Sequence, residues 1–340
     1  MKSYTKAFIP YKGYYSTPFA RWQGSMQYDN SIELGASTAR RWFLEKKIDP
    51  SVLDYMYFGS TVAQNHWFVA HNYAAAILTD DKKYLPALFV NQACATSTTI
   101  LNLLAKDLEL GVYETGYGLM TDRCSNGPHT IWPDPLGPGG HVDREDWNMD
   151  NFAGTPRHRA YMAQTGENVA VEVGITKEEC DAVVLRRYEQ YQDALANERA
   201  FQKRYMFSPE VTVTKKKKRL VEEDEGGTPT TAEGLAKLKP QYPNGVLSYG
   251  AQTFPADGNC GIIVTSRDKA KELSADAKVE IQILSYGFAR VKPMFMPAAP
   301  IPAAQMALAN AGLNIGDIKA VKTHNPFAVN DLAFSKKNGI

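Results

Sequence analysis

The sequence predicts an α/β protein, and two patterns carry this prediction. Short apolar runs rich in β-branched and aromatic residues alternate with longer segments whose apolar residues recur at helical spacing. This alternation occurs on both sides of an irregular stretch, about residues 117–245, that is rich in Pro, Gly and charge. Alternating strands and helices favour a sheet covered by helices. We therefore expect α/β regions at residues 1–116 and 246–340 and an inserted loop domain between them.

The first region predicts helices and strands in alternation. After a strand-like opening, SIELGASTARRWFLEKK (31–47) has the apolar spacing of a helix, and DYMYFGSTV (54–62) is typical of a strand. An apolar segment follows at 70–78. LPALFV (85–90) is apolar, β-leaning and too short for a helix, and therefore predicts a buried strand. Residues 96–110 predict the next helix.

Cys94 lies where this strand turns into the helix, with Ser97 or Thr98 as possible caps. The first turn of a helix presents unpaired N–H groups and a partial positive charge, which lower the pKa of a nearby thiol. This placement suits a nucleophile. A free cysteine is also among the most buried residue types, so Cys94 as a small buried apolar residue is the alternative.

The insert and the last region contain fewer regular elements. The insert predicts an amphipathic helix near 176–199 and contains the charge run KKKKRLVEEDEGG (215–227). Such a run favours a solvated hairpin or loop, and binding of phosphate or an acidic partner is the alternative. The last region predicts strands near 261–265 and 279–285 and a helix near 300–312.

Composition excludes several classes of protein. A net charge of +1 gives no reason to expect nucleic acid or an anionic membrane as a partner. No apolar run has the length of a signal peptide core or of a membrane span, about 20 residues. The four cysteines form no CxxC pair, which argues against a zinc site or a disulfide scaffold: Cys94, Cys124, Cys180 and Cys260. We expect a cytoplasmic protein without a bound metal.

Five stretches, in order along the chain, resemble motifs of the thiolase family. STPFAR (16–21) resembles its opening RTPFGR, and VNQACATSTT (90–99) resembles its nucleophile strand, turn and helix. MAQTGENVAVEVGITKEECDAVVLRRYEQ (162–190) is similar to the loop-domain signature MTAENVAxxxGIsReeqD. Residues 230–266 follow its LakLkPaF and DGAAA segments, and residues 299–331 resemble the helix and strand before its NEAF or HDxF motif. The chain is identified as a member of the thiolase superfamily, similar to the degradative thiolases.

The resemblance implies a layered α/β/α/β/α fold of two related βαβαβ-type halves around the loop domain. It also implies cleavage of a 3-oxoacyl-CoA, in which a cysteine thiolate attacks the 3-keto carbon and CoA then takes up the acyl group. Cys94 matches the nucleophile. His324 falls where the family carries an Asn or His that helps hold a catalytic water or the thioester oxygen. Its neighbour Asn325 departs from the family, which more often has Glu or Asp at that position. Without the resemblance, His324 is interpreted as a structural histidine at a strand end.

CoA enters this scheme as a co-substrate, and no covalently bound cofactor is expected. The resemblance places the following residues along CoA: Tyr161, Met162, Gln252, Thr253 and Phe327. Several of these positions depart from the family. Its Gly-Ser-Gly after the cysteine is Ala95-Thr96-Ser97 here, its His-Met pair is Tyr161-Met162, and its Asn-Ala-Ser loop is Ala251-Gln252-Thr253. These changes put the substrate preference in doubt.

The family's GHP histidine, which activates the nucleophile, and its second, CxG cysteine are expected beyond Ile340. Residues 246–340 are then expected to hold the end of the first half and a truncated second half. Two alternatives stay open. The chain is a non-catalytic subunit that binds acyl-CoA, or it is a condensing thiolase of the acetoacetyl-CoA type that works in the biosynthetic direction.

Bulky residues near the expected pocket resemble those of thiolases of anaerobic aromatic degradation, which implies a substrate such as benzoylsuccinyl-CoA, giving benzoyl-CoA and succinyl-CoA. They include Tyr161, Phe254-Pro255 and Met294-Phe295-Met296-Pro297, which otherwise fill the core. A basic residue is then expected at the free carboxylate of the substrate: Arg123, Arg157, Arg159 or Arg290.

The family resemblance also implies a homodimeric core, and the apolar run at 70–78 suits such an interface. A small OB-fold, zinc-binding protein is a further expected partner.

Overall fold

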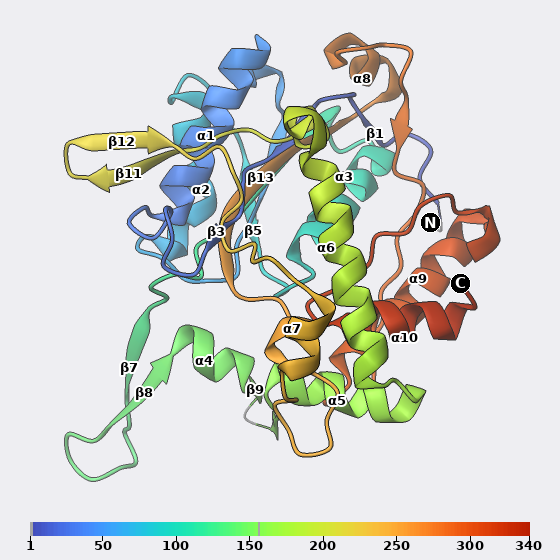
Figure 1. Cartoon of the computed structure of the whole chain (residues 1–340). Coiled ribbons are helices and arrows are strands. Elements are labelled where there is room, and N and C mark those ends of the chain that lie inside the picture. The colour runs from blue at the N-terminus through green and yellow to red at the C-terminus, as the bar shows by residue number, and fades with distance from the viewer. Residues whose placement is uncertain (1–2, 156) are drawn as a thin grey trace.

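A computed structural model describes residues 3–155 and 157–340 of the chain and places one large sheet at its centre (Figure 1). The sheet has eight strands in the order β14-β1-β13-β6-β4-β5, with β2 and β3 also paired to β13. The strands are β1 (Phe8–Ile9), β2 (Tyr14–Ser16), β3 (Ala20–Arg21), β4 (Tyr55–Gly59), β5 (Ala87–Val90), β6 (Thr115–Asp122), β13 (Ala256–Thr265) and β14 (Ile281–Gln282). The expected α/β class is confirmed.

Three parallel strands set the position of the candidate site. β4 pairs in parallel with β5 on one side and with β6 on the other, so that Gly59 lies opposite both Val90 and Met120. The carboxyl ends of these strands therefore meet at one edge, where open α/β sheets hold their ligands. β6 continues to Asp122, past the boundary expected at residue 116, and β13 runs antiparallel beside its whole length.

Helices cover both faces of the sheet. Helices α1 (Ser31–Lys46) and α2 (Ala70–Thr79) lie on one face, and α3 (Thr96–Leu110) lies on the other (Figure 1). The alternation of side chains along a strand explains this arrangement. In β4, Met56 and Phe58 pack in the core under α1 and α2, whereas Tyr57 packs in the core under α3. The result is a layer of helices, the sheet and a second layer of helices, which are three of the five layers of the expected α/β/α/β/α fold.

The predicted helices 31–47 and 96–110 form with nearly the predicted bounds. Asn30 caps α1 by accepting a hydrogen bond from the backbone N–H of Ile32. The run at 70–78 forms α2, but much of its apolar surface is used inside the chain, because Ala70, Ala74, Ala75 and Leu78 are buried in the core shared with α1 and the sheet. The prediction that this run supplies an interface is therefore wrong for that face of the helix.

The insert forms small hairpins and helices: β7 (His129–Pro133), β8 (Val142–Asp146), α4 (Trp147–Phe152), β9 (Gly154–Thr155), β10 (His158–Arg159), α5 (Met162–Val173), α6 (Lys177–Arg199), β11 (Glu210–Thr214), β12 (Lys217–Leu220) and α7 (Ala232–Lys237). A capping box between Thr176 and Glu179 begins α6. The charge run falls on the exposed β11–β12 hairpin and the loop after it, so the solvated hairpin is confirmed.

The last region contains three α-helices: α8 (Arg267–Leu273), α9 (Pro300–Ala311) and α10 (Ala328–Asn338). The strand expected at 279–285 is reduced to the two residues of β14, and residues 319–325, which precede Pro326, are irregular rather than a strand. Helix α10 packs against α5 and α6 of the insert. Among the described residues, none of the helices combines the length and apolar character that a membrane crossing requires.

Candidate active site

Cys94 lies in a tight, hydrogen-bonded turn between β5 and α3. The Thr96 hydroxyl donates to the carbonyl of Ala93 at 2.7 Å and accepts from the backbone N–H of Gln92 at 2.9 Å. Ala93 adopts a positive φ of 46°, which the surrounding hydrogen bonds hold in place. The turn therefore presents Cys94 at an exposed tip on a braced backbone.

The predicted caps of α3 are wrong. The N-cap residue is Ala95, which offers no side-chain cap, and Ser97 lies inside the helix. Thr98 donates its hydroxyl to the carbonyl of Ala95 at 3.0 Å. Thr96 braces the turn from the first helical position instead. A hydroxyl can either cap a helix or bond back to a nearby carbonyl, and only the backbone path of the turn decides between the two.

Gly59 allows α3 to approach the end of β4. A Cβ atom at this position would lie 2.5 Å from Ile100 Cδ1 and 2.8 Å from Thr96 Cγ2. Any larger residue would therefore push the start of α3 away from the sheet. The glycine thus fixes the depth at which the turn with Cys94 sits over the strand ends.

The thiol of Cys94 is less acidic than an ordinary thiol. Although the residue is exposed, desolvation by the protein around the sulfur raises the pKa of the Cys94 thiol. The backbone N–H of Cys94 opposes this rise, and the negative charge of Asp122 adds to it. The sequence predicted a lowered pKa from the nearby helix start. That prediction is wrong, because desolvation, to which the charge of Asp122 adds, outweighs the lowering of the pKa by the backbone N–H of Cys94. At pH 7 the residue is therefore a neutral thiol that must lose its proton before it attacks.

Asp122 is a feature that the sequence reasoning missed. It ends β6, and its carboxylate accepts hydrogen bonds from the backbone N–H groups of Thr61 and Val62 at 2.7 and 3.0 Å and from the hydroxyls of Ser60 and Thr61. Burial raises the pKa of Asp122, and these hydrogen bonds oppose the rise. The carboxylate thus ties the loop after β4 to the end of β6. The sequence predicts no strand over residues 115–122, so no local signal singles out Asp122.

The second part of the candidate site joins residues far apart in the sequence. The backbone N–H of Thr253 donates to the carbonyl of Pro326 at 2.6 Å, and Gln252 forms a β-bridge with Phe327. Phe327 is buried at the start of α10 and packs in one apolar cluster with Met162 at the start of α5. Four of the five residues predicted along CoA therefore gather around the start of α10. Tyr161, the fifth, precedes Met162 and is 59% exposed.

His324 and Asn325 lie just before this cluster. His324 is exposed, and desolvation by the surrounding protein lowers its pKa. The unperturbed value is about 6.5, so the imidazole of His324 is neutral at pH 7. A neutral imidazole can donate one hydrogen bond and accept another. Asn325 is partly buried.

Strand β13 connects the two parts. Its residue Gly258 pairs with Asp122, and the neighbouring Asp257 accepts a hydrogen bond from the backbone N–H of Ser125 at 2.9 Å. The loop with Gln252 and Thr253 leads directly into this end of β13. The carboxyl ends of the parallel strands and the loop that holds His324 are therefore linked through one strand.

Other residues singled out in the sequence either pack in the fold or lie exposed on the surface. Phe295 and Met296 pack against the apolar cluster of α5 and α10, and Pro297 is buried, so these three residues fill core, whereas Met294 is 38% exposed. Arg123 donates from one nitrogen to the carbonyls of Gln27 and Asp29. The other three candidates for a substrate carboxylate are exposed: Arg157, Arg159 and Arg290.

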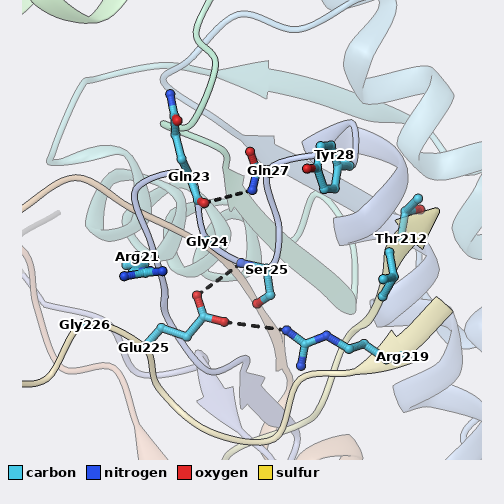
Figure 2. Close-up of a pocket in the computed structure, with 11 residues that line it drawn as sticks. Arg21, Gln23, Gly24, Ser25, Gln27, Tyr28, Thr212, Arg219, Glu225 and Gly226 are labelled. Carbon is cyan, nitrogen blue, oxygen red and sulfur yellow. Dashed lines mark hydrogen bonds and ion pairs between the residues drawn. The ribbon is translucent and has the colours of Figure 1, made fainter. Parts of the chain in front are cut away.

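A polar cavity of about 570 Å³ lies between the loop after β3 and the β11–β12 hairpin (Figure 2). Glu225 spans it, accepting from the backbone N–H of Ser25 at 3.1 Å and pairing with Arg219 at 3.9 Å. The residues that line the cavity include none of the candidate catalytic or CoA residues. We therefore assign the cavity to the attachment of the hairpin and not to the candidate active site.

Known proteins resemble this chain over most of its length. The family model described as "Thiolase, N-terminal domain" matches residues 13–268. A 3-ketoacyl-CoA thiolase of Pseudoalteromonas translucida is 28% identical over 331 residues, which cover 95% of this chain and 80% of the relative. The human mitochondrial 3-ketoacyl-CoA thiolase in complex with CoA aligns with a TM-score of 0.86 at 23% identity, covering 99% of this chain and 84% of that one.

A crystal structure of the acetyl-CoA acetyltransferase of Bacillus anthracis aligns with a TM-score of 0.87 at 21% identity, covering 100% of this chain and 85% of that one. At sequence identities of 21% and 23%, these structural alignments establish that the chain has the fold of the two structures. The family match spans more than half of the 340 residues and includes the strand, turn and helix around Cys94. The chain therefore belongs to the thiolase family of acyltransferases.

Proposed function

We propose that this chain cleaves a 3-oxoacyl-CoA through an acyl intermediate on Cys94. The thiolate attacks the 3-keto carbon, and the bond between C2 and C3 breaks. The shorter acyl-CoA leaves as an enolate and takes up a proton at C2. The thiol of free CoA then attacks the acyl group on Cys94, which restores the cysteine. The observation that carries the proposal is the exposed Cys94 on a braced turn at the carboxyl ends of β4, β5 and β6.

His324 suits a role at the thioester oxygen. Its pKa is lowered, so it is neutral at pH 7 and can donate a hydrogen bond, directly or through a water, to an oxygen that gains negative charge. The raised pKa of Cys94 requires a base to remove its proton. We assign stabilisation of the negatively charged thioester oxygen to His324. The proton of Cys94 is then removed by a base other than His324. Asn325 extends the same segment.

CoA is proposed to lie along the cluster at the start of α10. Thr253 and Gln252 form one wall through their backbone contacts with Pro326 and Phe327. Met162 and the exposed ring of Tyr161 form the other wall at the start of α5. Apolar walls with a few fixed polar groups are typical of cofactor sites.

Acylation of Cys94 is the first expected outcome. Incubation with acetoacetyl-CoA without free CoA, followed by digestion and mass spectrometry, should find an acetyl group on the peptide with Cys94. Cys94→Ala should remove the adduct and the thiolysis activity, because no other side chain takes the place of the nucleophile. The matched control, Cys180→Ala, changes a buried cysteine of α6 and should keep the adduct. An adduct confined to Cys124, Cys180 or Cys260 would refute the assignment.

The ionisation of Cys94 should respond to Asp122. The carboxylate raises the thiol pKa, so Asp122→Asn removes a negative charge and should shift the pH profile of Cys94 alkylation by iodoacetamide to lower pH. Quantitative mass spectrometry of the Cys94 peptide gives the midpoint. Asp257→Asn is the matched control, since Asp257 is also buried but does not act on Cys94, and it should leave the profile in place. An unchanged or higher midpoint in Asp122→Asn would contradict the electrostatic argument.

We further propose an aromatic 3-oxoacyl-CoA, such as benzoylsuccinyl-CoA, as the substrate. The exposed rings of Tyr161 and Phe254, 59% and 44% accessible, support this proposal, since both flank the proposed CoA site. The measurement is kcat/KM for thiolysis of an aryl 3-oxoacyl-CoA and of acetoacetyl-CoA. We expect a preference for the aryl compound that falls in Tyr161→Ala and Phe254→Ala. A preference for acetoacetyl-CoA would remove the aromatic substrate and keep the thiolase reaction.

A homodimer is proposed across the free edge of β5. This edge strand pairs only with β4 among the described strands, and unpaired edges invite pairing with a second chain. Large apolar side chains near it are exposed: Phe68 95%, Tyr84 93% and Leu88 46%. Light scattering at micromolar concentration should give a dimer, and Leu88→Lys should weaken it. Leu136→Lys, on the distant β7–β8 hairpin, is the control. A monomeric wild type would contradict the proposal.

A further inference from the structure

The segment before His324 has one side-chain anchor. Within residues 3–155 and 157–340, the only hydrogen bond formed by the irregular stretch 319–325 is donated by the hydroxyl of Thr323 to Oδ1 of Asp331. On the other side of His324, Pro326 is held by Thr253. The residue next to His324 in the chain is therefore fixed to the first turns of α10.

Asp331 is held in turn by helix α6. Its Oδ2 accepts hydrogen bonds from Nε and Nη2 of Arg187, at 3.1 and 2.5 Å. Both side chains are about 70% buried, with 28% and 29% of their surfaces accessible. Partly buried, charge-assisted bonds with two donors are stronger and more directional than exposed ion pairs. Arg187 thus holds Oδ2 of the carboxylate, while Oδ1 accepts from Thr323.

The helices are joined by a second ion pair that does not touch this segment. Lys336 near the end of α10 pairs with Glu179 at the start of α6, at 2.7 Å. The attachment of α10 to α6 therefore does not rest on Arg187 and Asp331 alone. The two ion pairs therefore have different contacts. The pair of Arg187 and Asp331 reaches the His324 segment. Lys336, which also donates to the carbonyl of Gly174 after α5 at 2.9 Å, does not.

We propose that Asp331, oriented by Arg187, is a positioning residue that acts through Thr323 to hold His324 in place for the reaction. The inference rests on the proposed role of His324 at the thioester oxygen. Displacement of such a donor by about 1 Å costs up to about 100-fold in rate. The CoA side of the segment keeps its own anchor at Thr253. Loss of the Thr323 bond should therefore lower kcat and leave KM for CoA nearly unchanged.

The test compares thiolysis kinetics of single variants. Thr323→Val keeps the shape of the side chain but removes the hydroxyl, and we expect kcat to fall about 10- to 100-fold with little change in KM. Thr323→Ser keeps the hydroxyl and should restore most of kcat. Asp331→Leu, which offers Thr323 no acceptor, should resemble Thr323→Val. Lys336→Met, the matched control, removes the other ion pair between α6 and α10 and should keep wild-type kcat. Thermal melting of each variant checks that it is folded.

His324→Ala separates this inference from the proposed function. If His324→Ala loses kcat and Thr323→Val retains it, the positioning role is overturned and the role of His324 stands. If His324→Ala retains full kcat, both are overturned. In the double variant Thr323→Val/His324→Ala we expect no loss beyond that of His324→Ala, because Thr323 acts only through His324. Additive losses would overturn the inference and assign Thr323 an independent, structural role.

Discussion

The close approach of α3 to the ends of the parallel strands is the constraint on which the site depends. Gly59, Gly116 and Gly118 leave room for Ile100, Leu104 and Thr96 against β4 and β6, and an added Cβ at each would come within 2.9 Å of one of these side chains. Because α3 lies this close to β4 and β6, the chain must change direction within a tight turn between β5 and α3. The positive φ of Ala93 and the hydrogen bonds of Thr96 make that reversal, and they place Cys94 at the edge where the strands end.

The charge of Asp122 at this edge of the sheet fixes the nearby backbone but makes the thiol of Cys94 less acidic. The buried Asp122 gathers four donors from the loop after β4 and so fixes the wall beside the turn. The same carboxylate, together with desolvation, keeps the neighbouring thiol protonated. A carboxylate that accepts several hydrogen bonds fixes the backbone that donates them, but its charge disfavours a second negative charge nearby, here a thiolate at Cys94. The candidate nucleophile therefore depends on proton removal during the reaction rather than on a permanent thiolate.

Long-range contacts bring the rest of the candidate site together. Glu167 of α5 accepts hydrogen bonds from the backbone N–H groups of Val246 and Leu247, both at 2.8 Å, and so ties the insert to the segment that precedes the Gln252 loop. That loop contacts the start of α10, and α10 is held by α6. The insert is therefore linked to the loop with His324 by two routes, from α5 through the Gln252 loop and from α6 through α10.

The sequence by itself determined the elements whose signals are local. Apolar periodicity predicted α1 and α3, the charge run predicted the exposed hairpin, and the position of Cys94 between strand and helix was visible without any structure. Tertiary structure decided what depends on distant neighbours: the raised pKa of Cys94, the burial of α2, the packing of Phe295 and Met296 into core, and the contact of Arg187 with Asp331. The physical reason is that desolvation, charge and packing depend on atoms brought close by folding, whereas helical and strand patterns depend on neighbours along the chain.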